Sequence, residues 1–183
     1  MRVIAGAYKG RRLVTPKGAT TRPTADQVRT ALLDTLGPWL PDARLLDLFA
    51  GAGGVGLEAL SRGAAHVTFV ERDRRALDAL AENIKTLDLE SRTHVARGDV
   101  VRQLARLAAE GRRFELVFLD PPYATDDGAR TLAALGGGAL VAPQGLVIAQ
   151  HLTKRELPEY GVLRAFRDRR FGETTLTFFR AEG

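Results

Sequence analysis

From Ala43 onward the chain alternates short apolar runs with amphipathic segments, and this alternation restricts the fold more than any other feature. Runs rich in Leu, Val and Phe predict strands over residues 44–49, 66–71, 93–97, 114–120 and 145–151. The intervening segments predict helices over residues 54–62, 73–87, 100–110 and 127–135. Such alternation indicates βαβ units and a parallel sheet covered on both faces, and a terminal antiparallel hairpin is expected over residues 162–170 and 174–180.

The first 22 residues differ in character from this body. Glycine and proline interrupt their short runs, and two brief strands are expected over residues 1–7 and 12–15, in a β-hairpin-like arm. Thr24, with Gln27 three positions later, forms a capping box. We therefore expect a helix that links residues 1–22, the arm, to one domain spanning residues 23–183.

Positive charge is concentrated in the N-terminal segment. Residues 1–30 contain seven Lys or Arg and one acid, a net charge of +6; the whole chain carries +5, so the other 153 residues sum to −1. This segregation favours contact with a polyanion, because Lys and Arg that neutralise phosphates release counterions. A solvated, solubilising tail is the alternative. The side chains expected to contact nucleic acid are Arg2, Lys9, Arg11, Arg12 and Lys17.

The composition excludes several classes of protein. Hydrophobic residues make up 45% and charged residues 27%, as in globular proteins, and no run approaches the roughly 20 apolar residues of a membrane-spanning helix. Cysteine is absent, which excludes disulfides and thiolate metal sites, and His66, His94 and His151 lack ligand spacing. We expect a cytoplasmic protein without a metal or membrane contact, for which a monomer suffices.

A glycine-rich loop of the form G-x-G-x-x-G follows the first strand of the body. Gly51, Gly53 and Gly56 occupy its glycine positions, where a ligand can approach the backbone closely. The motif alone fits a nicotinamide-dinucleotide enzyme as well as a methyltransferase. Asp47 favours the methyltransferase, because a carboxylate repels a pyrophosphate and attracts the ammonium and sulfonium groups of S-adenosylmethionine. Phe49 is expected mainly in the core, with its backbone near this cofactor.

Each of the first four strands ends on or near an acid, namely Asp47, Glu71, Asp99 and Asp120. The carboxyl ends of parallel strands share one sheet edge, so these acids should line one cleft. Glu71 is expected to accept both ribose hydroxyls of the cofactor, and Asp99 its adenine amino group. The neighbouring Arg72 and Val100 are assigned to the same site. A strand-end charge for Glu71 and a helix cap for Asp99 are the alternatives.

The tetrapeptide Asp120-Pro121-Pro122-Tyr123 is the most specific signal in the chain. The lone pair of a base amino group is delocalised into the ring, so an enzyme must orient the amine with hydrogen-bond acceptors. Asp120 and the Pro121 carbonyl can accept, and consecutive prolines make the loop rigid. Tyr123 can stack on a base that has left its helix. We therefore predict methylation of an exocyclic amino nitrogen, with an ordinary Pro-Pro turn as the alternative.

Further segments resemble a known family. They are residues 2–6 with 9–11, residues 22–24 with 28–29, and residues 49–51 with 57–64. Together with the glycine loop and the Asp-Pro-Pro-Tyr motif, these segments resemble the RsmD-type bacterial 16S ribosomal RNA guanine-N2 methyltransferases. The resemblance spans most of the chain, although Gln27, Thr30 and Ala52 depart from the family pattern.

The resemblance implies a Rossmann-like class I methyltransferase fold with a mostly parallel seven-stranded sheet. It implies S-adenosylmethionine above the glycine loop, and as acceptor a guanine N2 amino group in small-subunit RNA, either naked or in the assembled subunit. Arg22, Pro23 and Thr24 would close over the cofactor, and the preceding arm would touch RNA.

Three other functions stay open on the residues alone. Adenine-N6 methylation of DNA or RNA shares the tetrapeptide, although the arm is too short to read a DNA sequence by itself. A non-catalytic RNA-binding or ribosome-assembly protein would keep the pocket without methyl transfer, and a dinucleotide oxidoreductase would use the glycine loop. Outside the motifs, Asn83 is expected on the solvated face of its helix, and Trp39 in a packing contact.

Overall fold

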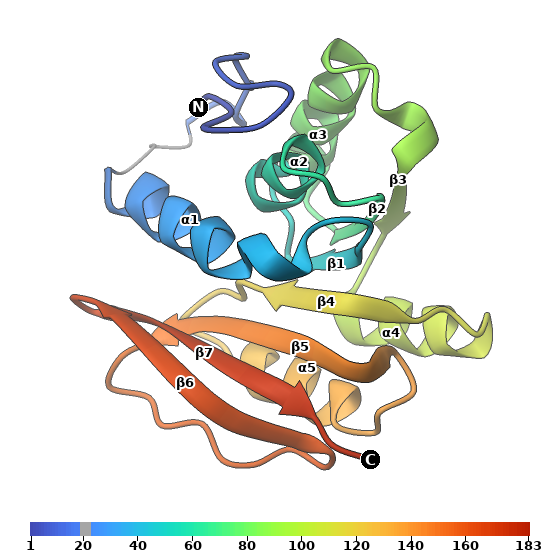
Figure 1. Cartoon of the computed structure of the whole chain (residues 1–183), viewed down its shortest axis with the longest axis vertical. Coiled ribbons are helices and arrows are strands. Elements are labelled where there is room, and N and C mark those ends of the chain that lie inside the picture. The colour runs from blue at the N-terminus through green and yellow to red at the C-terminus, as the bar shows by residue number, and fades with distance from the viewer. Residues whose placement is uncertain (19–22) are drawn as a thin grey trace.

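A computed structural model describes residues 1–18 and 23–183, which are organised by one seven-stranded sheet (Figure 1). The strands are β1 (Arg44–Leu48), β2 (His66–Glu71), β3 (Thr93–Arg97), β4 (Phe114–Leu119), β5 (Val141–Leu152), β6 (Leu163–Phe171) and β7 (Thr174–Ala181). Their order across the sheet is β3-β2-β1-β4-β5-β7-β6. The first five strands pair in parallel, whereas β7 runs antiparallel to β5 and β6. The predicted fold class is confirmed.

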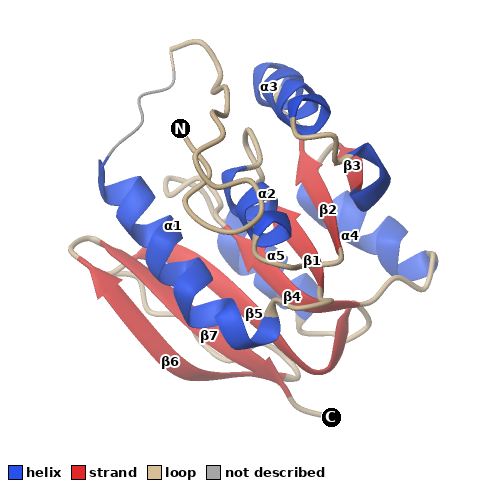
Figure 2. Cartoon of the chain, turned by 45° about the horizontal axis from the view of Figure 1, so that its top comes forward, coloured by secondary structure: helices blue, strands red, loops and turns tan. Residues whose placement is uncertain are grey.

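Helices cover both faces of this sheet (Figure 2). On one face lie α1 (Pro23–Leu36), α2 (Gly54–Ser61) and α3 (Arg74–Thr86), and on the other α4 (Val100–Ala109) and α5 (Asp127–Leu135). Two short 3-10 turns, η1 (Gly37–Trp39) and η2 (Glu90–Arg92), complete the connections. Within the described ranges, no helix combines the length and hydropathy that crossing a bilayer requires.

Each face of the sheet contributes to its own hydrophobic core. Phe178 and Phe179 are neighbours on β7, and because strand side chains alternate, one enters the core under α1–α3 and the other the core above α4 and α5. Both side chains are at most 1% exposed. Complete burial of a side chain of this size contributes about 1.5–3 kcal/mol. The sheet is therefore stabilised from both sides as far as its C-terminal hairpin.

The N-terminal arm contains no regular strand within its described residues, and the prediction of two strands there is wrong. A single antiparallel bridge joins Arg2 to Arg12. Between them Gly6 and Gly10 adopt positive φ angles of 89° and 84°, so the chain turns back too sharply for a ladder to extend. The arm instead packs against the body, where Val3 and Leu13 enter the α1–α3 core.

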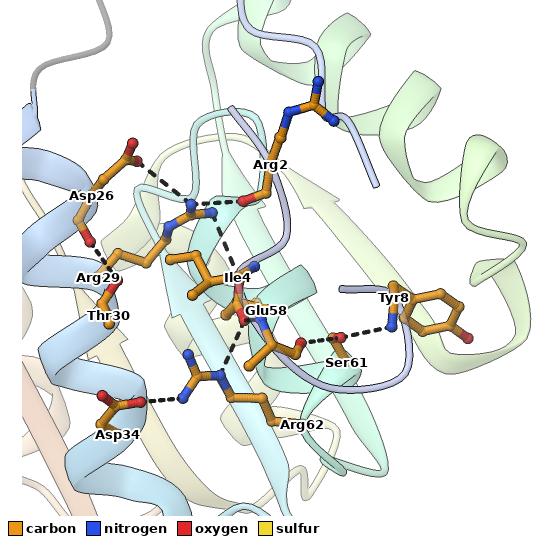
Figure 3. A network of polar contacts seen from close by, with 12 residues as sticks. Arg2, Ile4, Tyr8, Asp26, Arg29, Thr30, Asp34, Glu58, Ser61 and Arg62 are labelled. Atoms are coloured by element: carbon orange, nitrogen blue, oxygen red, sulfur yellow. Dashed lines mark hydrogen bonds and ion pairs between the residues drawn. The ribbon is translucent and has the colours of Figure 1, made fainter. Parts of the chain in front are cut away.

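A fully buried carboxylate attaches the arm to the body (Figure 3). Glu58, on α2, accepts the backbone N–H groups of Ile4 and Ala5 at 2.8 and 3.0 Å. It also accepts Arg62 Nε at 3.0 Å, and Arg29 Nη1 lies 4.0 Å from its Oε1. Because a buried charge is tolerated only when it is paired and hydrogen-bonded, these partners account for Glu58 in the interior.

Two of the remaining side-chain predictions are wrong. Asn83 is 2% exposed, and its amide bonds both the N–H and C=O of Val14 and the carbonyl of Ala52. It lies three residues after buried Leu80, on the same face of α3, which is the sequence signal for burial. Trp39 is 42% exposed, because the η1 turn ends the helix before its apolar stripe reaches this position.

Replacing Glu58 with alanine should lower the free energy of unfolding by about 3–5 kcal/mol, because it removes the acceptor of two backbone N–H groups of the arm and of Arg62 Nε, and a nearby anion for the buried Arg29. Urea denaturation measures the change. The matched control is Glu110→Ala, which removes an exposed pair with Arg106 at the same i, i+4 spacing and should cost less than about 1 kcal/mol. Equal effects of the two substitutions would contradict this account of Glu58.

Candidate active site

The crevice above β1 and β4 is the natural ligand position in this sheet. The two strands are parallel neighbours, but the chain continues from β1 toward β2 and from β4 toward β5, which lie on opposite sides. The connecting helices therefore diverge, and the carboxyl ends of both strands stay open. Leu48 pairs with Leu119, so the glycine loop and the Asp120 loop leave the sheet at the same level.

The glycine loop is tied to the end of β2. Phe49 and Gly51 both have φ angles of 59°, and the Gly51 N–H donates to Glu71 Oε1 at 2.8 Å. The other carboxylate oxygen of Glu71 accepts the N–H groups of Arg72 and Asp73. Glu71 thus shapes the loop as well as facing the crevice, because Oε1 accepts one N–H group and keeps a second lone pair for a ligand hydroxyl.

Packing explains two of the three motif glycines. A Cβ at Gly53 would lie 2.5 Å from Leu80 Cδ1, and the φ angle of 90° disfavours any other residue there. A side chain at Gly56 would collide with Phe69 of β2. Gly56 therefore allows α2 to pack closely on β2 and Gly53 allows the loop to pack against Leu80 of α3, whereas Gly51 has open space beside it.

A cavity of about 540 Å³ contains most of the predicted site residues. Its lining includes Phe49, Glu71, Arg72, Asp99, Val100, Asp120, Pro121, Pro122 and Tyr123. Asp99 also has the alternative role of a helix cap, because Asp99 Oδ2 accepts the Arg102 N–H at 3.0 Å. Its Oδ1 forms no bond with the described residues, so the cap leaves one oxygen for a ligand.

A second cavity, of about 260 Å³, adjoins the first and contains the remaining acid, Asp47. Phe49, Asp120 and Gln150 line both cavities, so the two spaces share one wall. Asp47 is buried and accepts the Gly56 N–H at 3.0 Å. The four predicted acids therefore face one crevice, but Asp47 belongs to its second compartment.

The crevice is electrostatically suited to a cation. Burial raises the pKa of Asp47 well above its usual value; the Gly56 N–H opposes this, and the charges of Asp120 and Glu71 raise it further. Asp120 is open to the cavity but enclosed by protein elsewhere, and this loss of water raises its pKa to about 6. Carboxylates held in this way gain stability from a positively charged ligand, which S-adenosylmethionine is.

The Asp-Pro-Pro-Tyr loop is held in place by hydrogen bonds from several elements. The Asp120 N–H lies 3.4 Å from the Leu48 carbonyl of β1. The hydroxyl of Tyr123 is 3.3 Å from Thr174 Oγ1 on β7, and it accepts Gln150 Nε2 of β5 at 3.3 Å. The C-terminal hairpin thus supports the proposed base platform, which the sequence analysis did not anticipate.

The structure describes only some of the predicted site residues near the N-terminus. Arg22 lies outside the described residues, as do the side chains of Pro23 and Thr24, so their predicted closure over a cofactor stays a prediction. In the described part of the arm, residues 1–18, the basic side chains are exposed: Arg2, Lys9, Arg11, Arg12 and Lys17. Met1, Thr15 and Pro16 line the second cavity, which puts the arm at the border of the crevice.

The sequence analysis missed two residues of the crevice. Gln150 was hidden in an apolar strand, where one amide does not form a motif. Arg29 is 7% exposed beside the second cavity, and its Nη2 donates to the Arg2 carbonyl at 2.9 Å. Burial lowers the pKa of Arg29, whereas the nearby Glu58 and Asp26 raise it. Among the described residues no side chains cluster as a metal-ligand group.

Known proteins share this arrangement. A family model described as conserved hypothetical protein 95 matches residues 1–180. YlbH of Bacillus subtilis, named as a candidate rRNA methyltransferase, is 39% identical over the full length of both chains. The ribosomal RNA small subunit methyltransferase D of Escherichia coli is 36% identical over 158 residues, 86% of this chain and 78% of that protein.

A solved structure agrees with these sequence matches. The Escherichia coli protein yhhF, described as a candidate methyltransferase, covers 100% of this chain and 98% of its own at 33% identity, with a TM-score of 0.88. The agreement extends over both the sheet and its appended arm. This chain therefore belongs to the family described as conserved hypothetical protein 95, and its predicted resemblance to the RsmD-type methyltransferases is confirmed.

Proposed function

We propose that this chain transfers a methyl group from S-adenosylmethionine to the N2 amino group of a guanine in small-subunit ribosomal RNA. The observation that carries the proposal is the position of Asp120 on the wall between two adjoining cavities, with Pro121 beside it in the lining of the first. The names of the Bacillus subtilis and Escherichia coli relatives support RNA as the substrate class. Guanine N2 follows from the resemblance to the RsmD-type enzymes.

The donor fits the crevice on the chemistry of the residues present. Glu71, whose Oε1 accepts the Gly51 N–H, would accept the ribose hydroxyls and Asp99 the adenine amino group, while Phe49 borders the same space. The methionine part would extend toward Asp47, where its ammonium meets a carboxylate. The bound donor supplies a methyl group on a positively charged sulfur, and the protein needs only to position the acceptor against it.

Asp120 and Pro121 would position that acceptor. Their oxygens accept the two amino hydrogens, which turns the nitrogen lone pair toward the methyl carbon. As the new N–C bond forms, the S–C bond breaks, and one amino proton leaves to Asp120 and then to solvent. Tyr123 would stack on the base after it has left its helix, a contact worth about 1–3 kcal/mol.

The arm supplies the RNA contact in this proposal. Five of its basic side chains are exposed in residues 1–17, a segment whose Met1, Thr15 and Pro16 line the second cavity, and phosphate contacts there would hold the substrate over the crevice. We propose a division into an RNA-contacting arm, residues 1–22, and a methyltransferase domain, residues 23–183. A cytoplasmic monomer acting on RNA or on the small subunit completes the proposal.

Asp120→Ala should abolish methyl transfer to small-subunit RNA while the donor Kd stays within about threefold, because Asp120 holds the acceptor rather than the donor. Isothermal titration measures donor binding, and mass analysis of digested RNA identifies the product. Glu71→Ala is the opposite case and should weaken donor binding. Lost donor binding in Asp120→Ala would show that its role is misassigned. N6-methyladenosine as the wild-type product would favour the adenine alternative.

The activity should fall as the pH is lowered through about 6. Asp120 can take the amino proton, and accepts its hydrogen bond most strongly, only when ionised, and its raised pKa means that it protonates at that pH in the free protein. The profile of kcat/KM for the donor reports the free enzyme, so its acidic limb should lie near pH 6. The cationic donor stabilises the carboxylate, so the limb in kcat should lie lower. A kcat limb at higher pH than the kcat/KM limb would contradict this assignment.

Neutralising the arm should weaken RNA binding without changing donor binding. In the double variant Lys9→Ala, Arg12→Ala, each lost phosphate contact reduces the slope of log K against log salt by about 0.7, for a single-stranded contact. The matched control is Arg102→Ala, Arg106→Ala on α4, which lies on the opposite face of the sheet. RNA binding titrations at several salt concentrations give the slopes. Equal salt dependence of RNA binding in the two double variants would show that the arm does not contact the RNA.

A further inference from the structure

Gln150 lies beside Asp120 at the carboxyl edge of the sheet. Leu119 of β4 pairs with Ala149 of β5, and Asp120 and Gln150 are the next residues of the two parallel strands. Neighbouring strands are about 4.8 Å apart, and residues in register point to the same face. The two side chains accordingly line the same pair of cavities.

The order of the strands places Gln150 beyond the reacting nitrogen. The glycine loop follows β1, Asp120 follows β4, and Gln150 belongs to β5, in that order across the sheet. A base whose amino nitrogen is held at Asp120 and faces a donor above β1 must extend its ring away from β1. The ring atoms next to the amino group then lie over β5, within reach of the Gln150 amide.

A hydrogen-bond chain orients that amide. Gln150 Nε2 donates to the Tyr123 hydroxyl at 3.3 Å, and the same hydroxyl lies 3.3 Å from Thr174 Oγ1. When Tyr123 donates to Thr174, its oxygen is free to accept from Gln150. The amide carbonyl, Oε1, forms no hydrogen bond with the described residues. With one N–H of Nε2 directed at Tyr123, Oε1 is the acceptor that Gln150 can offer to the cavity.

We propose that Gln150 selects guanine as the methyl acceptor by accepting the N1–H group with its Oε1. Guanine carries the N1–H donor directly beside its N2 amino group, so Asp120 and Gln150 together match two adjacent donors. Adenine carries an acceptor nitrogen beside its N6 amino group, and this lone pair would face the Gln150 carbonyl. The inference rests on the proposed guanine-N2 activity and identifies the residue that distinguishes the two bases.

Gln150 has a competing role, which is to hold the Tyr123 hydroxyl, and a double-mutant cycle separates the two. The variants are Gln150→Leu, Tyr123→Phe and the double variant, assayed for kcat/KM with small-subunit RNA. Gln150→Leu should lower kcat/KM by roughly 10- to 100-fold, the discrimination expected of a base-edge hydrogen bond, and by a similar factor in the Tyr123→Phe background. If Gln150→Leu causes no further loss of kcat/KM in the Tyr123→Phe background, Gln150 acts only by holding Tyr123, and the inference is overturned.

Two controls accompany the cycle. Gln144→Leu makes the same substitution in β5, at an exposed position near the opposite end of the strand, and should leave kcat/KM unchanged. The donor Kd should be unchanged in every variant. Gln150→Glu keeps an acceptor at this position and should restore kcat/KM to within about tenfold of the wild type.

A base analogue tests the selection directly. The methylated guanine is first mapped in small-subunit RNA, and the same RNA is then prepared with 2,6-diaminopurine at that position. This base keeps the N2 amino group but has an acceptor in place of N1–H. The wild type should disfavour it by at least tenfold, and Gln150→Leu should treat the two bases alike. If the wild type forms N2-methylguanosine but accepts both bases equally, only this inference fails; without N2-methylguanosine as product, the proposed function fails as well.

Discussion

The parallel pairing of β1 with β4 is the constraint on which the rest of the active site depends. The chain places β2 and β3 on one side of β1 before it returns to form β4 on the other side. The helices after β1 and β4 therefore diverge, and the crevice between their carboxyl ends stays free of main chain. Because Leu48 and Leu119 are in register, the glycine loop and Asp120 meet there at the same level. The proposed donor and acceptor sites are neighbours because of this topology, although Gly51 and Asp120 are about 70 positions apart in the chain.

Buried polar side chains make the N-terminal arm part of this body. Glu58 binds the N–H groups of Ile4 and Ala5, and Asn83 binds Val14 while also holding the Ala52 carbonyl of the glycine loop. A buried polar group without its partner costs about 1–3 kcal/mol, so these contacts oppose detachment of the arm. The exposed basic side chains thus project from a fixed frame. RNA binding and donor binding are then expected to use one rigid surface, which aligns the two reactants before reaction.

The crevice places carboxylates where burial disfavours their charge. The raised pKa values of Asp47 and Asp120 show that the free protein holds these anions at a cost. Such a free-energy cost is typical of functional sites, where some folding stability is lost in exchange for a preorganised electrostatic field. A cationic donor relieves it, whereas the neutral product of methyl transfer relieves it less. Asp47, which would face the donor's ammonium in the proposed arrangement, can therefore favour binding of the donor.

The sequence by itself determined the sheet, the helices and the position of the proposed catalytic motif, because the periodicity of apolar residues and short motifs are local features of the chain. The sequence was enough to predict the alternation of strands and helices after Ala43, the glycine loop and the loop at Asp120–Tyr123. It also offered Asp99 as a helix cap, which the structure contains. The predictions of strands in the arm and of a solvated Asn83 were wrong, because the conformation of the arm and the burial of Asn83 depend on contacts with distant segments. Gln150 could not be predicted as a site residue, because a single amide in an apolar strand is not a recognisable sequence motif. Only the tertiary structure decided that it stands beside Asp120, since strand order and register are fixed by packing between elements far apart in the chain.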